Sequence, residues 1–276
     1  MTPPASMRLP IPHWYRDHCF NGRIILPAVE AMGLLAERAQ ILHPALRVDL
    51  MTDARFGKFL EIPQEADRID ILTEVEESAC GQVQARLLTR RQLKAMARLT
   101  THCELLFGGK ETACPGRAAM TAGPVREVSA ERIYRELVPF GPTFRTLQGT
   151  VSLGRQQARA WVRTPELTAD FPSLGSPFCL DGAMHAACVH GQQLADFVPF
   201  PVGFASRIIT VPTRAGEQYQ VTADLRFAGR DELVYDLQIL DQEKRIRETV
   251  LGLRMRDVSA GRQRPPAWIR TGPVQR

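Results

Sequence analysis

The sequence lacks the features that mark several large classes of protein. No apolar run in its 276 residues approaches the length of a membrane span, so we expect no membrane contact. The N-terminus lacks a basic start followed by an apolar core, so it does not read as a signal peptide. The six cysteines form no CxxC pair and no metal-finger spacing, which indicates reduced thiols and a cytoplasmic protein. There is no GxSxG serine elbow, no P-loop and no GxGxxG motif.

Acidic residues are also missing from the last stretch of the chain, residues 259–276. This stretch holds Arg262, Arg264, Arg270 and Arg276, which account for four of the five charges in the net charge of +5. No basic stripe with interleaved aromatics, zinc finger or RNA-recognition motif is present, so we expect no nucleic-acid binding. We interpret residues 259–276 as a flexible, solvated tail, with attraction to an acidic partner as the alternative.

Two buried helices are predicted, one in each half of the chain. The turn-rich segment 108–124 has the composition of a linker and divides the chain into parts of similar size. Pro27 opens an apolar helix that runs to Ile41, since proline fits a first turn where its missing N–H would be unpaired anyway. Pro177 opens a second apolar helix that ends near Gln193. Helices that are apolar on most sides are buried.

Strands follow each helix. They are expected near residues 46–60, 69–77, 83–89, 97–107, 146–153, 158–163, 220–227, 235–241 and 251–255. A short helix capped by Ser129 is expected at residues 129–137, at the start of the second half. In the clearest of them, apolar and polar residues alternate, and these side chains should share the apolar face: Val221, Ala223, Leu225 and Phe227. An antiparallel sheet buries its apolar face by wrapping around a helix. The expected fold is therefore α+β, with two helix-in-sheet domains at residues 1–122 and 123–258.

Two polar segments lie near the starts of the two helices. The first is His18-Cys-Phe-Asn-Gly22-Arg-Ile-Ile-Leu-Pro27, and the second is Asp181-Gly-Ala-Met-His185. His18 offers a base that titrates near neutrality, and Asp181 offers a carboxyl that can hold or give a proton. Elimination of water from a 3-hydroxyacyl group needs both, on opposite sides of the substrate.

With a third motif, Gly141-Pro142-Thr143-Phe144, these segments resemble the dehydratase domains of polyketide synthases. The shared pattern is HxxxGxxxxP, then GPxF, then DxxxH. The resemblance implies a double hotdog fold that dehydrates a 3-hydroxyacyl thioester to a trans-2-enoyl thioester. It implies acyl carrier protein as the partner, with the substrate on a phosphopantetheine thioester. We expect a discrete protein that works without a metal or a nucleotide cofactor.

The resemblance also assigns the site residues. It implies that His18 is the catalytic base, that Asp181 is the catalytic acid, and that His185 assists the aspartate. The residue before GPxF is often tyrosine in the family, and here it is Phe140, which removes a phenolic hydroxyl from the acid side.

The residues around these positions lead to three further predictions about the site. An apolar pocket should raise the pKa of Asp181, so that the carboxyl can hold a proton. Gly22 should let the backbone turn tightly beside the site. We expect the backbone N–H near Ala28, in the first turn of the helix after Pro27, to bind the thioester carbonyl.

Several alternatives stay open. The same fold could carry an enoyl-thioester isomerase, or the chain could be a non-catalytic module that binds acyl carrier protein. Asp181 and His185, four residues apart on a helix, could ligate a metal, although no third ligand lies nearby in the sequence. Pro142 and Phe144 could be ordinary turn and core residues. The sequence does not choose between a monomer and a homodimer, and it does not give the acyl chain length.

Overall fold

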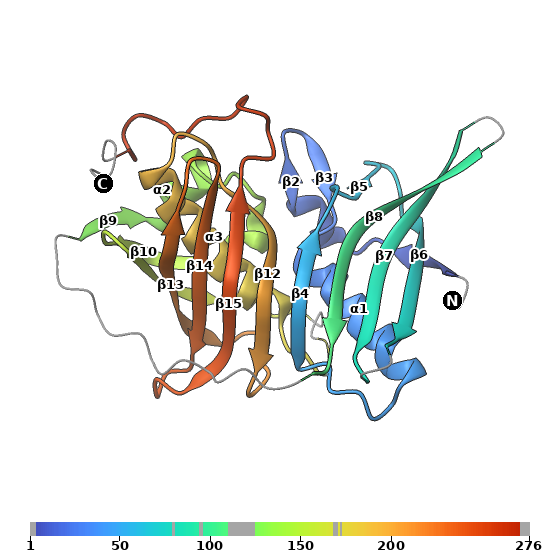
Figure 1. The fold of residues 1–276 in the computed structure, drawn as a ribbon. Coiled ribbons are helices and arrows are strands. Elements are labelled where there is room, and N and C mark those ends of the chain that lie inside the picture. The colour runs from blue at the N-terminus through green and yellow to red at the C-terminus, as the bar shows by residue number, and fades with distance from the viewer. Residues whose placement is uncertain are drawn as a thin grey trace.

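A single antiparallel sheet of twelve strands runs through both halves of the described chain (Figure 1). The computed structural model describes residues 4–78, 81–93, 96–109, 125–167, 171 and 173–270. From one edge to the other the strands are β1 (Ala5–Pro10), β6 (Arg68–Glu77), β7 (Val83–Leu93), β8 (Met96–Phe107), β4 (Leu50–Phe56), β12 (Phe200–Ile209), β15 (Ile246–Arg256), β14 (Glu232–Leu240), β13 (Gln218–Ala228), β11 (Gln157–Arg163), β10 (Leu147–Leu153) and β9 (Arg126–Ser129). The two halves of the chain meet where β4 pairs with β12.

Each half of the sheet wraps around one long buried helix. The helix α1 (Ala28–Leu42) contacts β6, β7 and β8, and the helix α3 (Pro177–Leu194) contacts β10, β11, β13 and β14. The two helices also contact each other behind the sheet in the view of Figure 1. The α+β fold of two helix-in-sheet units is confirmed. The boundary expected between residues 122 and 123 lies outside the described residues.

Smaller elements complete the ends of the two units. The helix α2 (Ala130–Glu136) is capped by Ser129, whose hydroxyl accepts a hydrogen bond from the Arg132 N–H at 3.3 Å. Two 3₁₀ helices, η1 (His13–Asp17) and η2 (Pro142–Phe144), face each other from different units. A second sheet has the order β2 (Cys19–Phe20), β3 (Arg23–Ile25) and β5 (Glu61–Ile62), and it lies near the junction of the units in Figure 1.

Strand β13 departs from its expected alternation. Val221 and Ala223 are fully buried, but the pairing of β13 with β14 shifts by one residue between Leu225 and Phe227. A shift of one residue turns the following side chains to the other face of a sheet. Phe227 is therefore 55% exposed, and the expectation that it shares the apolar face was wrong.

The basic segment that we expected to be solvated is packed against the protein as far as Ile269. Ile269 is fully buried, and the Arg132 guanidinium lies 3.5 Å from the centroid of the Trp268 ring. Arg264 pairs with Asp196 at 3.1 Å. The side chains of Ile269 and Trp268 hold this segment against the protein. The sequence prediction missed them because it considered only the abundance of proline and arginine in the segment. Residues 271–276 lie outside the described part of the chain.

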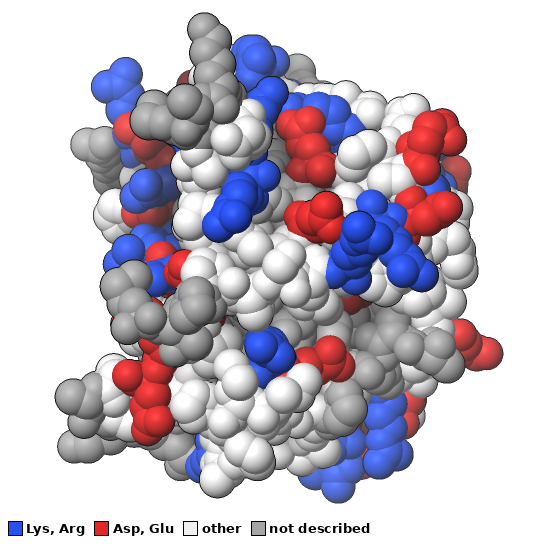
Figure 2. All heavy atoms as spheres, turned by 90° about the vertical axis from the view of Figure 1, so that its right-hand side faces the viewer, with Lys and Arg blue, Asp and Glu red and all other residues white. Residues whose placement is uncertain are grey.

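The surface shown in Figure 2 carries both signs of charge. Basic and acidic side chains are interspersed among uncharged ones on this face, and no single basic stripe crosses it. In the described ranges, no helix is long and apolar enough to cross a membrane.

Candidate active site

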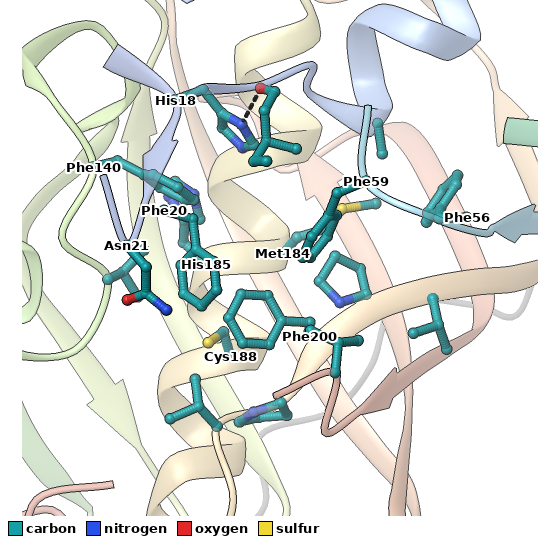
Figure 3. A pocket seen from close by; sticks show the side chains of 18 of the residues that line it. His18, Phe20, Asn21, Phe56, Phe59, Phe140, Met184, His185, Cys188 and Phe200 are labelled. Atoms are coloured by element: carbon teal, nitrogen blue, oxygen red, sulfur yellow. Dashed lines mark hydrogen bonds between the residues drawn. The ribbon is translucent and has the colours of Figure 1, made fainter. Parts of the chain in front are cut away.

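A pocket of about 450 Å³ lies between the two units (Figure 3). Its walls come from the turn around β2 and β3, the start of α1 and the end of β4 in the first unit. In the second unit they come from the loop after α2, from α3 and from the start of β12. His18, Asp181 and His185 all line this pocket, although the first is far from the other two in the sequence.

The imidazole of His18 is held by a backbone carbonyl and by aromatic rings. Its Nδ1 lies 2.8 Å from the carbonyl oxygen of Ile25, and because a carbonyl only accepts, Nδ1 carries the hydrogen. Phe140 stacks on the imidazole at a centroid distance of 4.4 Å, and Phe144 packs against it at 4.9 Å. Burial lowers the pKa of His18, and the nearby Asp181 carboxylate only partly opposes this. The imidazole is therefore neutral at pH 7, with the lone pair of Nε2 available to a proton.

Asp17, the residue before His18, forms hydrogen bonds between the two units. The carboxylate of Asp17 accepts hydrogen bonds from the N–H of Thr143 at 2.9 Å and from its hydroxyl at 2.5 Å. The backbone carbonyl of Asp17 accepts a third from the N–H of Gly141 at 2.7 Å. A Cβ on Gly141 would lie 2.8 Å from the Cα of Asp17, so the contact requires glycine. The GPxF motif, with Pro142 at the start of η2, thus holds the backbone that carries His18.

The carboxyl of Asp181 lies one turn into α3, beside His185. Its Oδ2 is 3.0 Å from the Nε2 of His185, and only 7% of the Asp181 surface is exposed. Burial raises the pKa of Asp181, but the charge and hydrogen bonding of His185 beside the carboxyl outweigh burial. The pKa of Asp181 is therefore below its usual range in the free pocket. Our expectation of a raised pKa was wrong because it considered the apolar surroundings without this close pairing.

Phe140 occupies the position where the resemblance led us to look for a tyrosine. Its ring packs against both imidazoles, 4.4 Å from His18 and 5.2 Å from His185 between centroids. A different phenol reaches the acid side, because the Tyr134 hydroxyl of α2 lies 3.3 Å from the Nδ1 of His185. The same hydroxyl accepts a hydrogen bond from the N–H of Leu147 at 2.9 Å. Sequence reasoning missed Tyr134, whose only signal was its place on the apolar side of a short helix.

The turn before β3 and the start of α1 form the wall next to His18. Asn21 and Gly22 have φ angles of 51° and 73°, values typical of a two-residue hairpin turn. A Cβ on Gly22 would meet no atom within 4 Å, so the conformation rather than the space favours glycine. Pro27 immediately precedes α1, and Ala28, the first residue of that helix, lines the pocket. Amides in a first turn have no acceptor within their own helix, so they can bind a ligand.

The rest of the pocket is apolar at its centre and basic at its exposed end. Phe20, Phe59 and Phe200 pack edge to face, with centroids 4.6 to 6.3 Å apart (Figure 3). Basic side chains that line the exposed end are Lys58, Arg262 and Arg264. Within the described ranges, no group of three or more His, Cys, Asp or Glu residues is placed to hold a metal ion.

A second buried carboxyl, which sequence reasoning missed, lies in the first turn of α1. Glu30 is 3% exposed and accepts a hydrogen bond from the Tyr15 hydroxyl at 3.1 Å. Burial raises the pKa of Glu30 to about 7; the hydrogen bond from Tyr15 opposes this rise, and the charge of Asp181 adds to it. Glu30 therefore titrates near neutral pH, in contrast to an exposed glutamate.

Replacing Glu30 with glutamine is expected to stabilise the protein above pH 7. In the unfolded chain the carboxyl ionises near its ordinary pKa of 4.5, whereas in the folded chain it keeps its proton up to about pH 7. Stability is therefore lost as the pH rises from about 4.5 to 7, by roughly 3 kcal/mol as an upper limit. Urea unfolding of wild type and Glu30→Gln at pH 5 and pH 8 measures the difference. An equal difference in unfolding free energy at the two pH values would contradict this prediction.

The fold and the pocket together define a class of protein. Two helix-in-sheet units side by side, with a neutral histidine and a buried aspartate in one pocket, are the arrangement of a double hotdog dehydratase. The family model described as polyketide synthase dehydratase N-terminal domain matches residues 112–265, a stretch that includes GPxF, Asp181 and His185 but not His18. The chain belongs to the polyketide synthase dehydratase family, and its reaction is the dehydration of a 3-hydroxyacyl thioester.

Solved structures show the same fold. The bifunctional dehydratase-cyclase domain of ambruticin biosynthesis is 19% identical, with a TM-score of 0.72 over 92% of this chain and 90% of that one. The dehydratase domain of PpsC from Mycobacterium tuberculosis, solved in complex with C12:1-CoA, is 18% identical, with a TM-score of 0.68 over 91% and 92%. The dehydratase domain of a mycocerosic acid synthase-like polyketide synthase is 15% identical, with a TM-score of 0.71 over 93% and 96%. No curated protein matches the chain.

Proposed function

We propose that His18 and Asp181 carry out the dehydration in the pocket between the two units. One observation carries this proposal: a neutral imidazole from the first unit and a buried carboxyl from the second line the same apolar pocket. General acid–base catalysis needs such a pair, held at fixed positions on either side of a substrate. His185 supports the carboxyl from a distance of 3.0 Å.

The reaction begins at the α-carbon of the thioester. The Nε2 of His18 takes the α-proton, and the electron pair moves toward the thioester carbonyl. Negative charge that develops on this oxygen is stabilised by the N–H near Ala28, at the positive end of the α1 dipole. The electrons then form the double bond between the α- and β-carbons as the C–O bond breaks.

The leaving hydroxyl receives its proton from Asp181 and departs as water. His18 is then protonated and Asp181 is ionised, so a proton transfer from one to the other restores the starting state. A substrate that fills the pocket removes water from the carboxyl, and burial favours the neutral form of a carboxylic acid. Substrate binding thus offsets the low pKa of Asp181 in the free pocket. No step of this mechanism uses a metal or a nucleotide cofactor.

The substrate is carried on the phosphopantetheine arm of an acyl carrier protein. The PpsC domain of similar fold was solved with C12:1-CoA, which is also an acyl thioester. Carrier proteins are usually acidic, and the basic end of this pocket offers Lys58, Arg262 and Arg264 to such a partner. The side chain of Arg264 is 61% exposed, so it can meet a second protein even while it contacts Asp196.

Product analysis tests this function. A 3-hydroxyacyl thioester on acyl carrier protein should yield the trans-2-enoyl thioester with loss of one water. Mass spectrometry of the product measures this loss. The same acyl group on free pantetheine should react more slowly, because it lacks the protein contacts at the basic end. Equal kcat/KM for the two substrates would contradict recognition of the carrier. A product with a shifted double bond and no loss of water would favour the isomerase, and binding without turnover would favour the non-catalytic module.

A further inference from the structure

We propose that the projecting end of the β7–β8 hairpin is the docking surface for the acidic carrier protein that brings the substrate. We call this surface, residues 89–93 and 96–101, the hairpin extension. The inference rests on the proposed function and deepens it, because it names the surface through which this site receives its partner. None of the three motifs lies on the hairpin extension, and the matched family model begins after it, at residue 112.

The hairpin extension is a two-stranded piece of sheet that projects beyond its neighbours (Figure 1). Strand β6 pairs with β7 only as far as Leu88, and β4 pairs with β8 only from Cys103 onward. In the described part of the chain, β7 and β8 therefore pair only with each other from Thr89, opposite Thr100, toward their turn. Two strands without a third are marginally stable in water, and both of their faces are open to a partner.

The hairpin extension is basic, and its charges are unpaired. Residues 78–103 contain no acidic residue. Arg90, Arg91 and Arg98 are exposed, and within the described ranges none of their guanidinium groups pairs with a carboxylate. Arg91 lies directly opposite Arg98, and like charges at opposite positions destabilise a pair of strands. An acidic partner would relieve this repulsion and so stabilise the hairpin extension when it binds.

The base of the hairpin extension forms part of the pocket wall. His102 lines the pocket together with Gly57 and Lys58. The ring nitrogens of His102 lie 2.7 Å from the carbonyl oxygen of Lys58 and 2.8 Å from the hydroxyl of Thr89. The backbone carbonyl of His102 accepts a hydrogen bond from the N–H of Gly57 at 2.9 Å. The hairpin extension therefore begins at the basic end of the pocket, beside Lys58.

An acidic carrier protein fits this surface better than a nucleic acid does. Residues 89–101 hold basic side chains but no aromatic ring on which a base could stack. Complementary charge speeds the association of two proteins and orients them as they meet. A carrier protein oriented by the hairpin extension would present its phosphopantetheine arm at the end of the pocket where Lys58 lies.

The test reverses two charges on the hairpin extension and two charges elsewhere. Arg91→Glu/Arg98→Glu still places like charges opposite each other, so the repulsion within the hairpin is kept. Arg155→Glu/Arg230→Glu makes the same change in net charge at two exposed arginines that do not line the pocket. Only the first pair should lower kcat/KM for a 3-hydroxyacyl group on acyl carrier protein, at least about tenfold, with kcat changed less than about twofold. Equal losses in the two variants would assign the effect to net charge and overturn the proposal.

The same acyl group on pantetheine separates this proposal from the proposed function. Both double variants should dehydrate the pantetheine substrate at the wild-type rate, because that substrate does not need the docking surface. If Arg91→Glu/Arg98→Glu loses as much activity on pantetheine as on the carrier protein, the pocket itself is altered and the proposal is overturned. If wild type dehydrates neither substrate, the proposed function fails instead, and binding of the carrier protein still decides the role of the hairpin extension.

Hydrogen exchange measures that binding without activity. Acyl carrier protein added to wild type should slow exchange in residues 89–93 and 97–101 and leave the turn at Arg155 unchanged. The single variant Arg98→Glu places opposite charges across the strands, so it should protect the free hairpin and yet lower kcat/KM for the carrier-bound substrate. An unchanged kcat/KM in Arg98→Glu overturns the proposal. Absence of protection in wild type overturns it even if no variant folds.

Discussion

Replacing Asp181 with asparagine is expected to stop the loss of water while His18 continues to exchange the α-proton of the substrate. Asparagine keeps the shape of the side chain but cannot supply an acidic proton, so dehydration should fall by about 10²- to 10⁴-fold. The carboxylate of Asp181 raises the pKa of His18 in wild type, so its removal leaves His18 at least as neutral as before. Incubation of the substrate in deuterium oxide, followed by mass spectrometry, measures both reactions in one sample.

Two further variants serve as controls for the Asp181→Asn result. His18→Ala should lose both dehydration and deuterium exchange, because the base is needed for each. Asp224→Asn removes another buried carboxylate, 8% exposed and bound by Gln157 at 2.5 Å, and should keep both reactions. If Asp181→Asn loses exchange as completely as dehydration, then proton removal and water loss are one concerted step. If it dehydrates at the wild-type rate, Asp181 is not the acid.

The sequence predicted those parts of the fold that depend on the conformational preferences of neighbouring residues. Pro27 and Pro177 marked the starts of α1 and α3, because proline suits only the beginning of a helix. Strand β12 was missed, although it joins the two units. Its pairing shifts between Pro201 and Gly203, and most of its C-terminal residues are buried on both faces, so no polar–apolar alternation appears. A central strand with a bulge does not show the periodicity of a half-buried strand.

The parts of the site that sequence missed depend on distances between segments remote in the chain. Motif spacing singled out His18 and Asp181, and both line the pocket. Nothing in the spacing indicates that Tyr134 reaches His185, because that contact depends on how α2 packs against α3. The direction of the Asp181 pKa shift was also missed because it depends on a distance in the folded chain. Burial and a close imidazole act in opposite directions, and their balance depends on a distance of 3.0 Å that no motif encodes.

Gly141→Ala is expected to lower both the stability and the turnover of the enzyme. The φ angle of Gly141 is −71°, which alanine adopts easily, so any effect comes from space and not from backbone conformation. An added Cβ would lie 2.8 Å from the Cα of Asp17, and the hydrogen bond between these two backbones, at 2.7 Å, holds them together. Overpacking of this kind costs roughly 1–3 kcal/mol of unfolding free energy.

The loss of turnover should exceed what the loss of stability explains. Asp17 precedes His18 directly, so a displaced Asp17 moves the imidazole relative to the substrate, and a misplacement of about 1 Å lowers a rate by roughly 10²-fold. Gly149→Ala provides the control, because Gly149 has a φ of 62° and open space for a Cβ, and it does not line the pocket. That variant should lose about 1–2 kcal/mol through its left-handed backbone and keep its kcat. Thermal unfolding and kcat of the two variants therefore separate a loss of stability from a displacement of His18. If Gly141→Ala keeps the wild-type kcat, the contact between GPxF and Asp17 does not hold His18 in position.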